Sequence, residues 1–427
     1  MKTKVMIFGG GYNAVQVYFS LKNNLRFYPI MAGSYDSHAT FISNDAIINL
    51  PYTREENFIE ELNECLNLHD IKFIVPAHDS AALTLMENQD KIHAVIVCSP
   101  LETTRVCRYK SLTYEKLKGE DILPEIYSFE NPTFPLFAKD DVGQGGKNAY
   151  LIENIEQMKE LEKDTLEYVL CEYLPGEEMT IDCFTDRHGK IRFIQPRCRA
   201  RLLNGITARA ENLELTEEII HIVETISAHL TFRGYWFVQC KKDKNGNYKL
   251  MEICTRFAGS FNLSKSLDVN LPLLALCDFS EMEVDITPNT YKIRLDKSYI
   301  DRYKIEYPYQ RVYIDFDDTL VFKRKKYNTE AIRFIYQCLN KGIYIVLITK
   351  HTYDIYETMR KIRFNADIFD EIIEVPLDRK KYEYMDTSIP SIFIDNAYEE
   401  RKAVKDHMDV PTFDVSNFDC LIDWADE

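Results

Sequence analysis

The fold of the last third of this chain is decided by the stretch Val312-Tyr313-Ile314-Asp315-Phe316-Asp317-Asp318-Thr319-Leu320. Its first three residues are apolar and predict a buried strand, and carboxylates cluster where that strand ends. The carboxyl end of a parallel strand borders the usual ligand crevice of an α/β sheet. One carboxylate of the cluster that holds Asp315 and Asp317 could therefore attack phosphorus as a nucleophile. A second could protonate the leaving oxygen and then activate water.

Two later strands end in polar groups that match this cluster. The predicted strand 344–349 ends at Thr349, whose hydroxyl can hold a phosphate oxygen, and the strand 391–395 ends at Asp395. Between them lie Lys380 and Lys381, either of which could neutralise the charge of a phosphate. So many carboxylates repel one another unless a hard cation such as Mg²⁺ sits among them.

These elements, in this order and mostly at strand ends, resemble the four motifs of the haloacid dehalogenase-like phosphatases. The resemblance covers 311–427, and it implies a Rossmannoid (HAD-like) domain without a large cap, because the gaps after the first two motifs are short. It implies these roles: Asp315 as nucleophile, Asp317 as acid and base, Thr349 with Lys380 or Lys381 as phosphate ligands, and Mg²⁺ on Asp315, Asp395 and the backbone carbonyl of Asp317. A solvated acidic turn is the plain alternative for the first motif taken alone.

A second constellation lies between residues 135 and 256. The predicted strand 136–139 ends in a lysine and is followed by the glycine-rich loop 143–146, whose backbone N–H groups can approach phosphate oxygens closely. The loop lacks the ending of a Walker P-loop. The segment 171–180 reads as an apolar hinge with acidic groups beyond it, which can serve adenine and ribose. Two later strands carry a glutamine, a glutamate and an arginine, which suit Mg²⁺ with a triphosphate.

This order resembles the ATP-grasp superfamily, in particular its carbamoyl-phosphate-synthase-like branch, over residues 1–286. The resemblance implies these roles: Lys110 and Lys139 as phosphate ligands, Gly143, Gly145 and Gly146 in a phosphate lid, Glu172 and Leu174 in the adenine hinge, Glu178 on ribose, Gln239 and Glu252 on Mg²⁺, and Arg256 on the reacting phosphate. The chain departs from the family at Cys254 and Thr255, where Asn and often Pro are usual. A thiol is a poor Mg²⁺ ligand, so a second metal is in doubt.

Three arginines at alternate positions, Arg197, Arg199 and Arg201, share one face if their segment is extended. They could form an anion cradle for an acceptor carboxylate and its acyl phosphate, with Arg199 as the central member. A solvated sheet edge is the alternative. Two other features are discounted. Gly9–Gly11 lacks a dinucleotide-binding pattern and reads as a tight turn, and a local helix cap is favoured for Asp79 over a place in a cleft.

The bulk composition narrows the classes of partner. The chain has 427 residues, a net charge of −16 and a pI near 5.2, which argues against nucleic acid or an anionic membrane as its main partner. No apolar run approaches the roughly 20 residues that span a bilayer. Eleven cysteines without a CxxC pair favour reduced thiols, so a cytoplasmic protein is expected. The sequence leaves open whether the chain forms a homo-oligomer.

The pattern of strands and helices predicts a multidomain α/β and α+β protein. We expect a doubly wound pre-ATP-grasp sheet at 1–100, an ATP-grasp domain at 101–286, a linker at 287–310 and the HAD-like domain at 311–427. The leading hypothesis is a bifunctional enzyme with ATP and Mg²⁺ as cofactors. One activity joins a small-molecule carboxylate to an amine through an acyl phosphate, and the other hydrolyses a phosphoester. The alternatives are a small-molecule kinase with a phosphatase domain, or a nucleotide-binding scaffold with degenerate sites.

Overall fold

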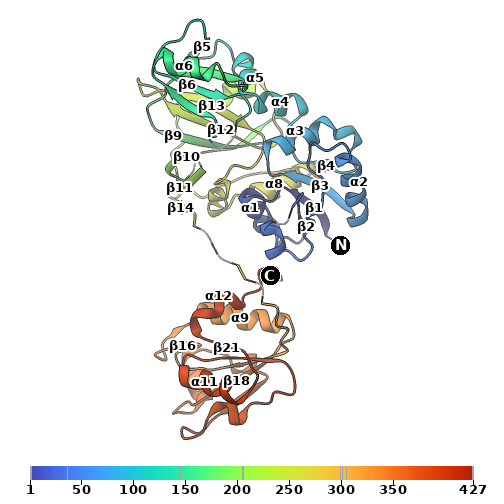
Figure 1. Ribbon diagram of the computed structural model, residues 1–427, viewed down its shortest axis with the longest axis vertical. Coiled ribbons are helices and arrows are strands. Elements are labelled where there is room, and N and C mark those ends of the chain that lie inside the picture. Colours follow the sequence, from blue (N-terminus) through green and yellow to red (C-terminus); the bar gives the residue numbers. More distant parts are fainter. Residues whose placement is uncertain are drawn as a thin grey trace. The chain divides into compact units, whose positions relative to one another are not determined.

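The computed structural model describes residues 2–35, 37–143, 146–203, 206–298, 300, 302–303 and 305–425. The chain forms two compact units, Met1–Thr40 with Asp45–Tyr299 and Phe41–Asn44 with Ile300–Glu427. The first, blue to yellow in Figure 1, is called the N-terminal unit, and the second, of which residues 300–427 are orange to red, is called the C-terminal unit. Within the described residues, no helix is both long and apolar enough to cross a membrane.

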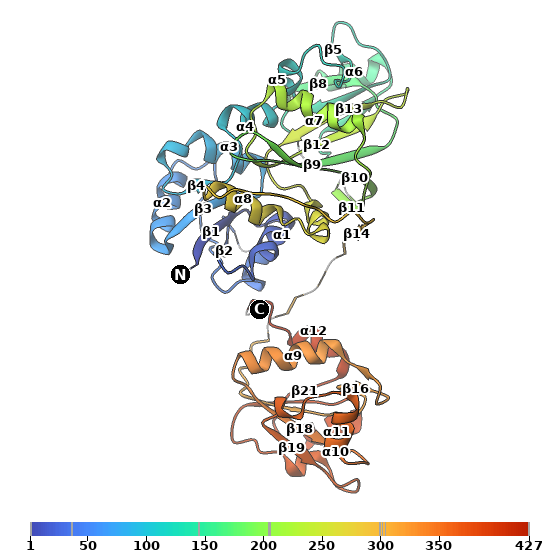
Figure 2. The ribbon, with the colours of Figure 1, turned by 180° about the vertical axis from the view of Figure 1, so that it is seen from behind.

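The N-terminal unit begins with a parallel sheet of strand order β2-β1-β3-β4. Met6 and Phe8 of β1 pack with α2 and α3, whereas Val5 and Ile7 are buried on the other face, which carries α1 (Figures 1 and 2). This is the doubly wound sheet that the sequence predicts. Its elements are β1 (Thr3–Phe8), α1 (Tyr12–Leu21), β2 (Phe27–Ala32), α2 (Phe58–His69), β3 (Ile71–Pro76), α3 (Asp79–Glu87) and β4 (Val95–Ile96).

Two helices, α4 (Leu101–Arg108) and α5 (Lys110–Lys116), lead into a pair of antiparallel sheets. The smaller sheet has the order β5-β8-β6-β7, and its strands are β5 (Ile126–Tyr127), β6 (Leu136–Asp140), β7 (Ala149–Ile152) and β8 (Tyr168–Glu172), with α6 (Ile155–Leu161) between the last two. The larger sheet has the order β13-β12-β9-β10-β11-β14. Its strands are β9 (Glu178–Thr185), β10 (Ile191–Leu203), β11 (Ile206–Asn212), β12 (Gly234–Lys242), β13 (Tyr248–Cys254) and β14 (Arg294–Asp296).

The larger sheet has one apolar and one polar face, because successive side chains of a strand alternate. Met179, Ile181 and Cys183 of β9 pack in a core with α7 (Glu217–His229). The alternate residues of β9 lie on the opposite face and are polar at positions 178, 180 and 182. That polar face is where the register of β10 and β12 brings the predicted site residues together.

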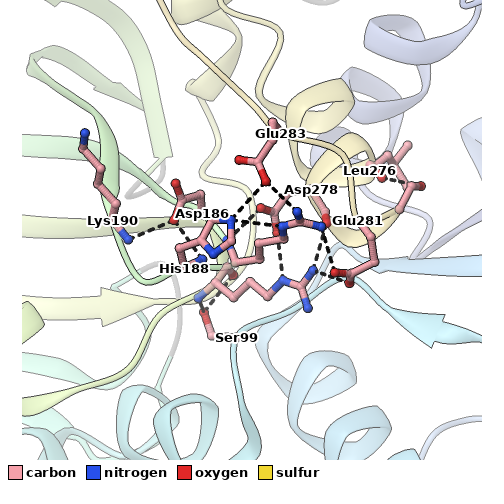
Figure 3. A network of polar contacts seen from close by, with 11 residues as sticks. Ser99, Asp186, His188, Lys190, Leu276, Asp278, Glu281 and Glu283 are labelled. Atoms are coloured by element: carbon pink, nitrogen blue, oxygen red, sulfur yellow. Dashed lines mark hydrogen bonds and ion pairs between the residues drawn. The ribbon is translucent and has the colours of Figure 1, made fainter.

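A dense ion-pair network fastens the turn between β9 and β10 to the end of α8 (Leu271–Phe279). Figure 3 shows its members converging around Asp278, which is fully buried. Oδ1 of Asp278 accepts a hydrogen bond from the backbone N–H of Arg187 at 2.7 Å, and Oδ2 accepts one from Nε of Arg233 at 2.8 Å. Glu281 and Glu283 complete the network by pairing with Arg187. Every buried charge here has a partner, which is the condition for burying ions without a large loss of stability.

The C-terminal unit is a second doubly wound parallel sheet, of order β19-β18-β15-β20-β21. Val312 and Ile314 of the central strand pack into a core on one face, and Tyr313 packs into a separate core on the other. Its elements are β15 (Arg311–Ile314), α9 (Thr329–Asn340), β18 (Tyr344–Thr349), α10 (Ile355–Ile362), β19 (Glu371–Glu374), β20 (Ser391–Ile394), α11 (Tyr398–His407), β21 (Thr412–Phe413) and α12 (Phe418–Leu421).

Two further segments bear on the linker and on the absence of a large cap that the sequence predicts. β14 pairs with β11, so three residues of the predicted linker 287–310 belong to the larger sheet. Between β15 and α9 the chain makes only a two-stranded hairpin, β16 (Val321–Phe322) with β17 (Lys326–Tyr327). The described chain thus inserts a hairpin, and no domain-sized cap, after the first acidic motif.

Candidate active sites

A pocket that is partly open to solvent lies between the smaller sheet and the edge of the larger one. Its walls are Phe137, Lys139, Cys171, Glu172, Tyr173, Leu174, Lys241 and Met251. It combines apolar side chains with a few charged groups, as small-molecule sites usually do. Three residues that the sequence predicts for nucleotide binding, Lys139, Glu172 and Leu174, are therefore brought together.

Lys139 lies at the end of β6 with its ammonium group buried. Its Nζ donates to the hydroxyl oxygen of Tyr114 at 3.2 Å, and Tyr114 in turn donates to the carbonyl of Met251 at 3.1 Å. Burial disfavours the charge of Lys139, but Tyr114, Cys171 and Glu252 outweigh it and raise its pKa. The amine therefore stays cationic, as a phosphate ligand must. Sequence reasoning missed Tyr114, because this residue lies in α5 and is part of no recognisable motif.

Lys110, also predicted to bind phosphate, holds the start of the glycine-rich loop. Its Nζ donates to the carbonyls of Asp140 at 3.0 Å, Asp141 at 3.3 Å and Gly143 at 3.0 Å. Burial lowers the pKa of Lys110, and the charge of Glu252 opposes that effect. The side chain can reach a phosphate only by exchanging one of these carbonyls for it.

The glycine-rich loop joins β6 to β7. Gly146 has a φ of +74°, which favours glycine. A Cβ on Gly143 would lie 3.0 Å from the Cβ of Asp140 and from the carbonyl oxygen of Lys147, so a side chain there would crowd the turn. Gly145, predicted as part of the lid, lies outside the described residues.

The predicted metal ligands Gln239 and Glu252 are directly opposed on β12 and β13. Opposed side chains on one face of an antiparallel pair lie about 5 Å apart at Cβ. The amide oxygen of Gln239 also accepts a hydrogen bond from Nη1 of Arg199 at 3.1 Å. Glu178, predicted to hold ribose, forms an ion pair with Arg199. The larger sheet thus gathers Gln239, Glu252, Glu178 and Arg199 on its polar face.

Oxygen donors of this kind fit Mg²⁺, which takes one or two side-chain ligands and completes its shell with phosphate oxygens and water. Gln239 and Glu252 supply two such donors. No group of three or more His, Cys, Asp or Glu side chains in the described chain is arranged to hold a metal ion. The donor set therefore fits a nucleotide-bound Mg²⁺ better than a site built from protein ligands alone.

The three alternate arginines of β10 each face a carboxylate. Arg197 and Asp182 form a fully buried pair, with Nε 2.7 Å from Oδ2. Arg201 pairs with Asp296 of β14 at 2.9 Å, as Arg199 pairs with Glu178. The predicted extended geometry is confirmed, but each guanidinium is already neutralised. The carboxylates lie in other strands, so the sequence motif alone gave no sign of them.

Arg256 lies just after β13 and contacts α3. Its Nε is 2.8 Å from Oδ2 of Asp79, and its guanidinium lies over the ring of Phe237 at 5.4 Å. The expectation of a purely local helix cap for Asp79 was wrong, because its carboxylate makes this long-range ion pair. Burial works to raise the pKa of Asp79, but Arg256 outweighs it and lowers that pKa.

In the C-terminal unit, Asp315, Lys381 and Asp395 form a buried cluster at the carboxyl end of the sheet. Nζ of Lys381 lies 2.5 Å from Oδ1 of Asp315 and 2.7 Å from Oδ2 of Asp395. Burial raises the pKa of Asp315 to about 6, with Lys381 opposing the rise and Asp395 adding to it. Burial also works against the charge of Lys381, but the two carboxylates outweigh it and raise its pKa.

Two threonines complete the cluster. Thr319 donates to Oδ2 of Asp315 at 3.0 Å, so both oxygens of that carboxylate are held. Thr349, at the end of β18, is fully buried, and its hydroxyl has no hydrogen-bond partner among the described residues. Buried polar groups without partners are rare in proteins. An unpaired hydroxyl here suits a ligand oxygen such as that of a phosphate.

The other two predicted residues, Lys380 and Asp317, lie outside the buried cluster and are partly exposed. Lys380 is half-exposed, and its Nζ lies 3.7 Å from Glu400, so Lys381 is the lysine that contacts the carboxylates. Asp317 is a third exposed, and its Oδ2 lies 2.6 Å from Nδ1 of His351. His351 was missed by sequence reasoning, although it follows Thr349 by two residues, immediately beyond a strand end.

The C-terminal cluster also fits Mg²⁺. Asp315 and Asp395 are two buried carboxylates that converge on one cation, which is the ammonium group of Lys381. Mg²⁺ is commonly bound by one or two carboxylates together with phosphate oxygens and water. Asp315 and Asp395 would hold the ion, and Lys381 and Thr349 would remain for the phosphate.

The N-terminal unit is similar to known proteins in sequence pattern and in fold. Residues 164–299 match the family model described as "ATP-grasp in the biosynthetic pathway with Ter operon". This range includes the larger sheet with Glu178, Arg199, Gln239 and Glu252. No curated protein matches the chain in sequence.

Solved structures share the fold of about two thirds of the chain. Biotin carboxylase from Campylobacter jejuni has a TM-score of 0.56 and 13% identity, covering 67% of this chain and 72% of its own. N5-carboxyaminoimidazole synthetase from Staphylococcus aureus, in complex with ADP, has a TM-score of 0.55 and 18% identity, covering 68% and 80%. L-amino acid ligase from Bacillus licheniformis has a TM-score of 0.52 and 17% identity, covering 67% and 78%. At such identities the likeness shows the ATP-grasp fold alone.

Proposed function

We propose that the N-terminal unit is an ATP-dependent carboxylate–amine ligase that works through an acyl phosphate. The observation that supports this most is that the residues predicted to bind the nucleotide line one pocket and that the predicted metal ligand Glu252 lies close to them. Lys139, Glu172 and Leu174 form its walls, and Glu252 lies near enough to influence the pKa of both Lys139 and Lys110. A nucleotide in the pocket would have its phosphates directed toward Gln239 and Glu252.

The proposed reaction has two steps. An oxygen of the substrate carboxylate attacks the γ-phosphorus of ATP, and the bond from that phosphorus to the bridging oxygen breaks to release ADP. The amine nitrogen then attacks the acyl carbon, and inorganic phosphate leaves with the electrons of the carbon–oxygen bond while the amine loses a proton. Lys139 would hold the transferred phosphoryl group and Arg256 would steady it. Mg²⁺ on Gln239 and Glu252 would neutralise the phosphate charge.

The test is ADP formation by the whole chain with ATP, Mg²⁺ and a panel of carboxylates and amines, read together with product masses. An amide product with stoichiometric ADP and phosphate supports the ligase. A phosphorylated product would indicate the alternative kinase. Tight ATP binding without ADP formation from any pair would indicate the scaffold, for which Cys254 in place of a metal ligand is the favouring feature.

We propose in addition that the C-terminal unit is a phosphomonoesterase with Asp315 as its nucleophile. The specific observation that favours it is the buried set Asp315, Lys381 and Asp395, with the hydroxyl of Thr349 at the next strand end, which has no hydrogen-bond partner among the described residues. The resemblance of these residues to the haloacid dehalogenase-like motifs gives the same roles.

In this reaction a carboxylate oxygen of Asp315 attacks phosphorus and the ester oxygen leaves with the bonding electrons, taking a proton from Asp317. Water then attacks the aspartyl phosphate and gives a proton to Asp317, so that inorganic phosphate is released and Asp315 is restored. Lys381 and Thr349 would hold the phosphoryl oxygens. Phosphate release from p-nitrophenyl phosphate with Mg²⁺ tests this proposal, and no release at any substrate concentration would contradict it.

A further inference from the structure

The hairpin β16–β17 is cationic and lies next to the candidate acid Asp317. It carries four consecutive basic residues, Lys323 to Lys326, in a chain whose net charge is −16. All four are exposed, and Asp317 itself forms a bridge with Val321 at the base of the hairpin. Within the described residues, no carboxylate lies within ion-pair distance of Lys323, Lys325 or Lys326. The three lysines of the hairpin therefore present positive charge that no carboxylate among the described residues neutralises.

The backbone of this turn makes the choice of residues unusual. The N–H of Lys325 donates to the carbonyl of Phe322 at 3.0 Å, which closes a four-residue turn. Its two central residues, Lys323 and Arg324, have φ angles of 48° and 55°. Such a turn favours Asn and Gly, because residues with a bulky side chain enter the left-handed region at an energetic cost. Here the chain places a lysine and an arginine instead, and strain of this kind is typically retained at functional sites.

Arg324 connects the turn to the site. Its guanidinium lies over the ring of Tyr353 at 4.8 Å, and its Nε is 3.6 Å from Oδ1 of Asp317. Tyr353 follows Thr349 by four residues beyond β18 and is 62% exposed. The cationic turn is therefore anchored beside the residue expected to protonate the leaving group, where the part of the substrate beyond the scissile phosphate must lie.

We propose that this hairpin binds a second phosphate of the substrate, so that the C-terminal unit acts on small phosphomonoesters carrying a further phosphate group. The inference rests on the proposed phosphatase and deepens it by naming a substrate class. Lys381 and Thr349 serve the phosphate that is cleaved, and Lys323, Arg324, Lys325 and Lys326 serve the one that remains. A phosphate held by several cations gains charge-assisted hydrogen bonds that a neutral leaving group cannot make.

The test uses three probes with the full chain and Mg²⁺. Hydrolysis of p-nitrophenyl phosphate gives the basal activity, and inhibition constants are measured against it for adenosine 3′,5′-bisphosphate, adenosine 5′-monophosphate and adenosine 3′-monophosphate. The three nucleotides share the same adenosine, so they differ only in the number and position of their phosphates. The bisphosphate is expected to bind at least ~10-fold more tightly than either monophosphate, with the ratio falling as salt is added.

The triple variant Lys323→Gln, Lys325→Gln, Lys326→Gln should bring that ratio to about 1. A matched variant, Lys361→Gln, Lys402→Gln, Lys405→Gln, removes three charges from α10 and α11 and should keep the ratio of the unaltered chain. Equal inhibition by bisphosphate and monophosphates, or an unchanged ratio in the hairpin variant, would overturn the inference while leaving the phosphatase intact. No hydrolysis of p-nitrophenyl phosphate would instead overturn the phosphatase on which the inference rests.

Discussion

The ammonium nitrogen of Lys381 lies 2.5 Å from Oδ1 of Asp315, and both side chains are almost fully buried. In the described part of the chain, its neighbour Lys380 is half-exposed and pairs with Glu400, not with Asp315 or Asp395. Two adjacent lysines thus have different environments, and only one of them can neutralise the proposed nucleophile and the phosphate bound to it.

Lys381→Met should therefore lower phosphate release at least ~100-fold, because a preorganised cation is lost from the site. The variant should also lose about 3–5 kcal/mol of stability in the C-terminal unit, since two buried carboxylates are left without a cation. Phosphate release and thermal unfolding are the measurements. The matched change Lys380→Met should have little effect on either, and equal losses in both variants would contradict the assignment.

Asp315→Asn should abolish phosphate release, with a fall of at least ~10³-fold, because an amide cannot form the acyl phosphate. ADP formation by the N-terminal unit should be unchanged. Asp318→Asn makes the same chemical change in a nearby carboxylate whose φ of 55° asparagine tolerates well, and it should retain most activity. Loss of ADP formation in the Asp315 variant would show that the two activities are coupled.

Glu252→Gln should reduce ADP formation at least ~10-fold and raise the Mg²⁺ concentration needed for half-maximal rate, because a charged metal ligand becomes neutral. A Mg²⁺ titration of ADP formation measures both effects. Glu177→Gln is the control, since that carboxylate is 82% exposed and pairs only weakly with Lys242. An unchanged Mg²⁺ dependence in the Glu252 variant would remove Glu252 from the metal site.

Asp79→Asn should destabilise the N-terminal unit by about 3–5 kcal/mol at pH 7, because Arg256 loses its buried partner. The pKa of Asp79 is lowered in the folded chain, so its stabilising contribution is complete above its unfolded pKa of about 3.9 and is lost progressively as pH falls from there through the lower folded pKa. The difference between variant and unaltered chain should therefore shrink below about pH 4.

Urea unfolding at pH 7 and at about pH 3.5 measures this difference. The chain has two tryptophans, so a Trp424→Phe background leaves Trp236 as the reporter of the N-terminal unit. Asp90→Asn, an exposed carboxylate in the same unit, is the control. The same loss of unfolding free energy at both pH values would mean that the charge of the Asp79 carboxylate is not what stabilises the N-terminal unit.

Lys297 should titrate near pH 8. Burial lowers its pKa to about 8, and the charges of Arg197 and Arg199 add to the effect. At pH 8 about half of it is then neutral, against under ~1% of an ordinary lysine. The rate of acetylation at Lys297, followed by mass spectrometry against pH, should have its midpoint near 8. A Lys297 midpoint above 10 would contradict the prediction.

The sequence alone determined the strands and helices that carry the sites. The apolar run of residues 312–314, followed at once by Asp315, was enough to predict a buried strand with a carboxylate at its end. The alternate spacing of Arg197, Arg199 and Arg201 was likewise read as an extended segment, and β10 is extended there. These inferences succeed because they depend on local periodicity and on where a strand stops.

Only the tertiary structure decided which side chains meet. Lys381 rather than Lys380 contacts Asp315, because Lys381 begins the short 3-10 helix Lys381–Tyr384 with its side chain buried, whereas Lys380 precedes that helix and stays half-exposed. Asp79 pairs with Arg256 across 177 positions of sequence, and Tyr114 reaches Lys139 from α5, where only Lys110 was predicted to take part in the site. Such contacts depend on long-range strand register and helix packing, which residue spacing does not encode. Residue types therefore set what chemistry was available, and packing set which groups could perform it.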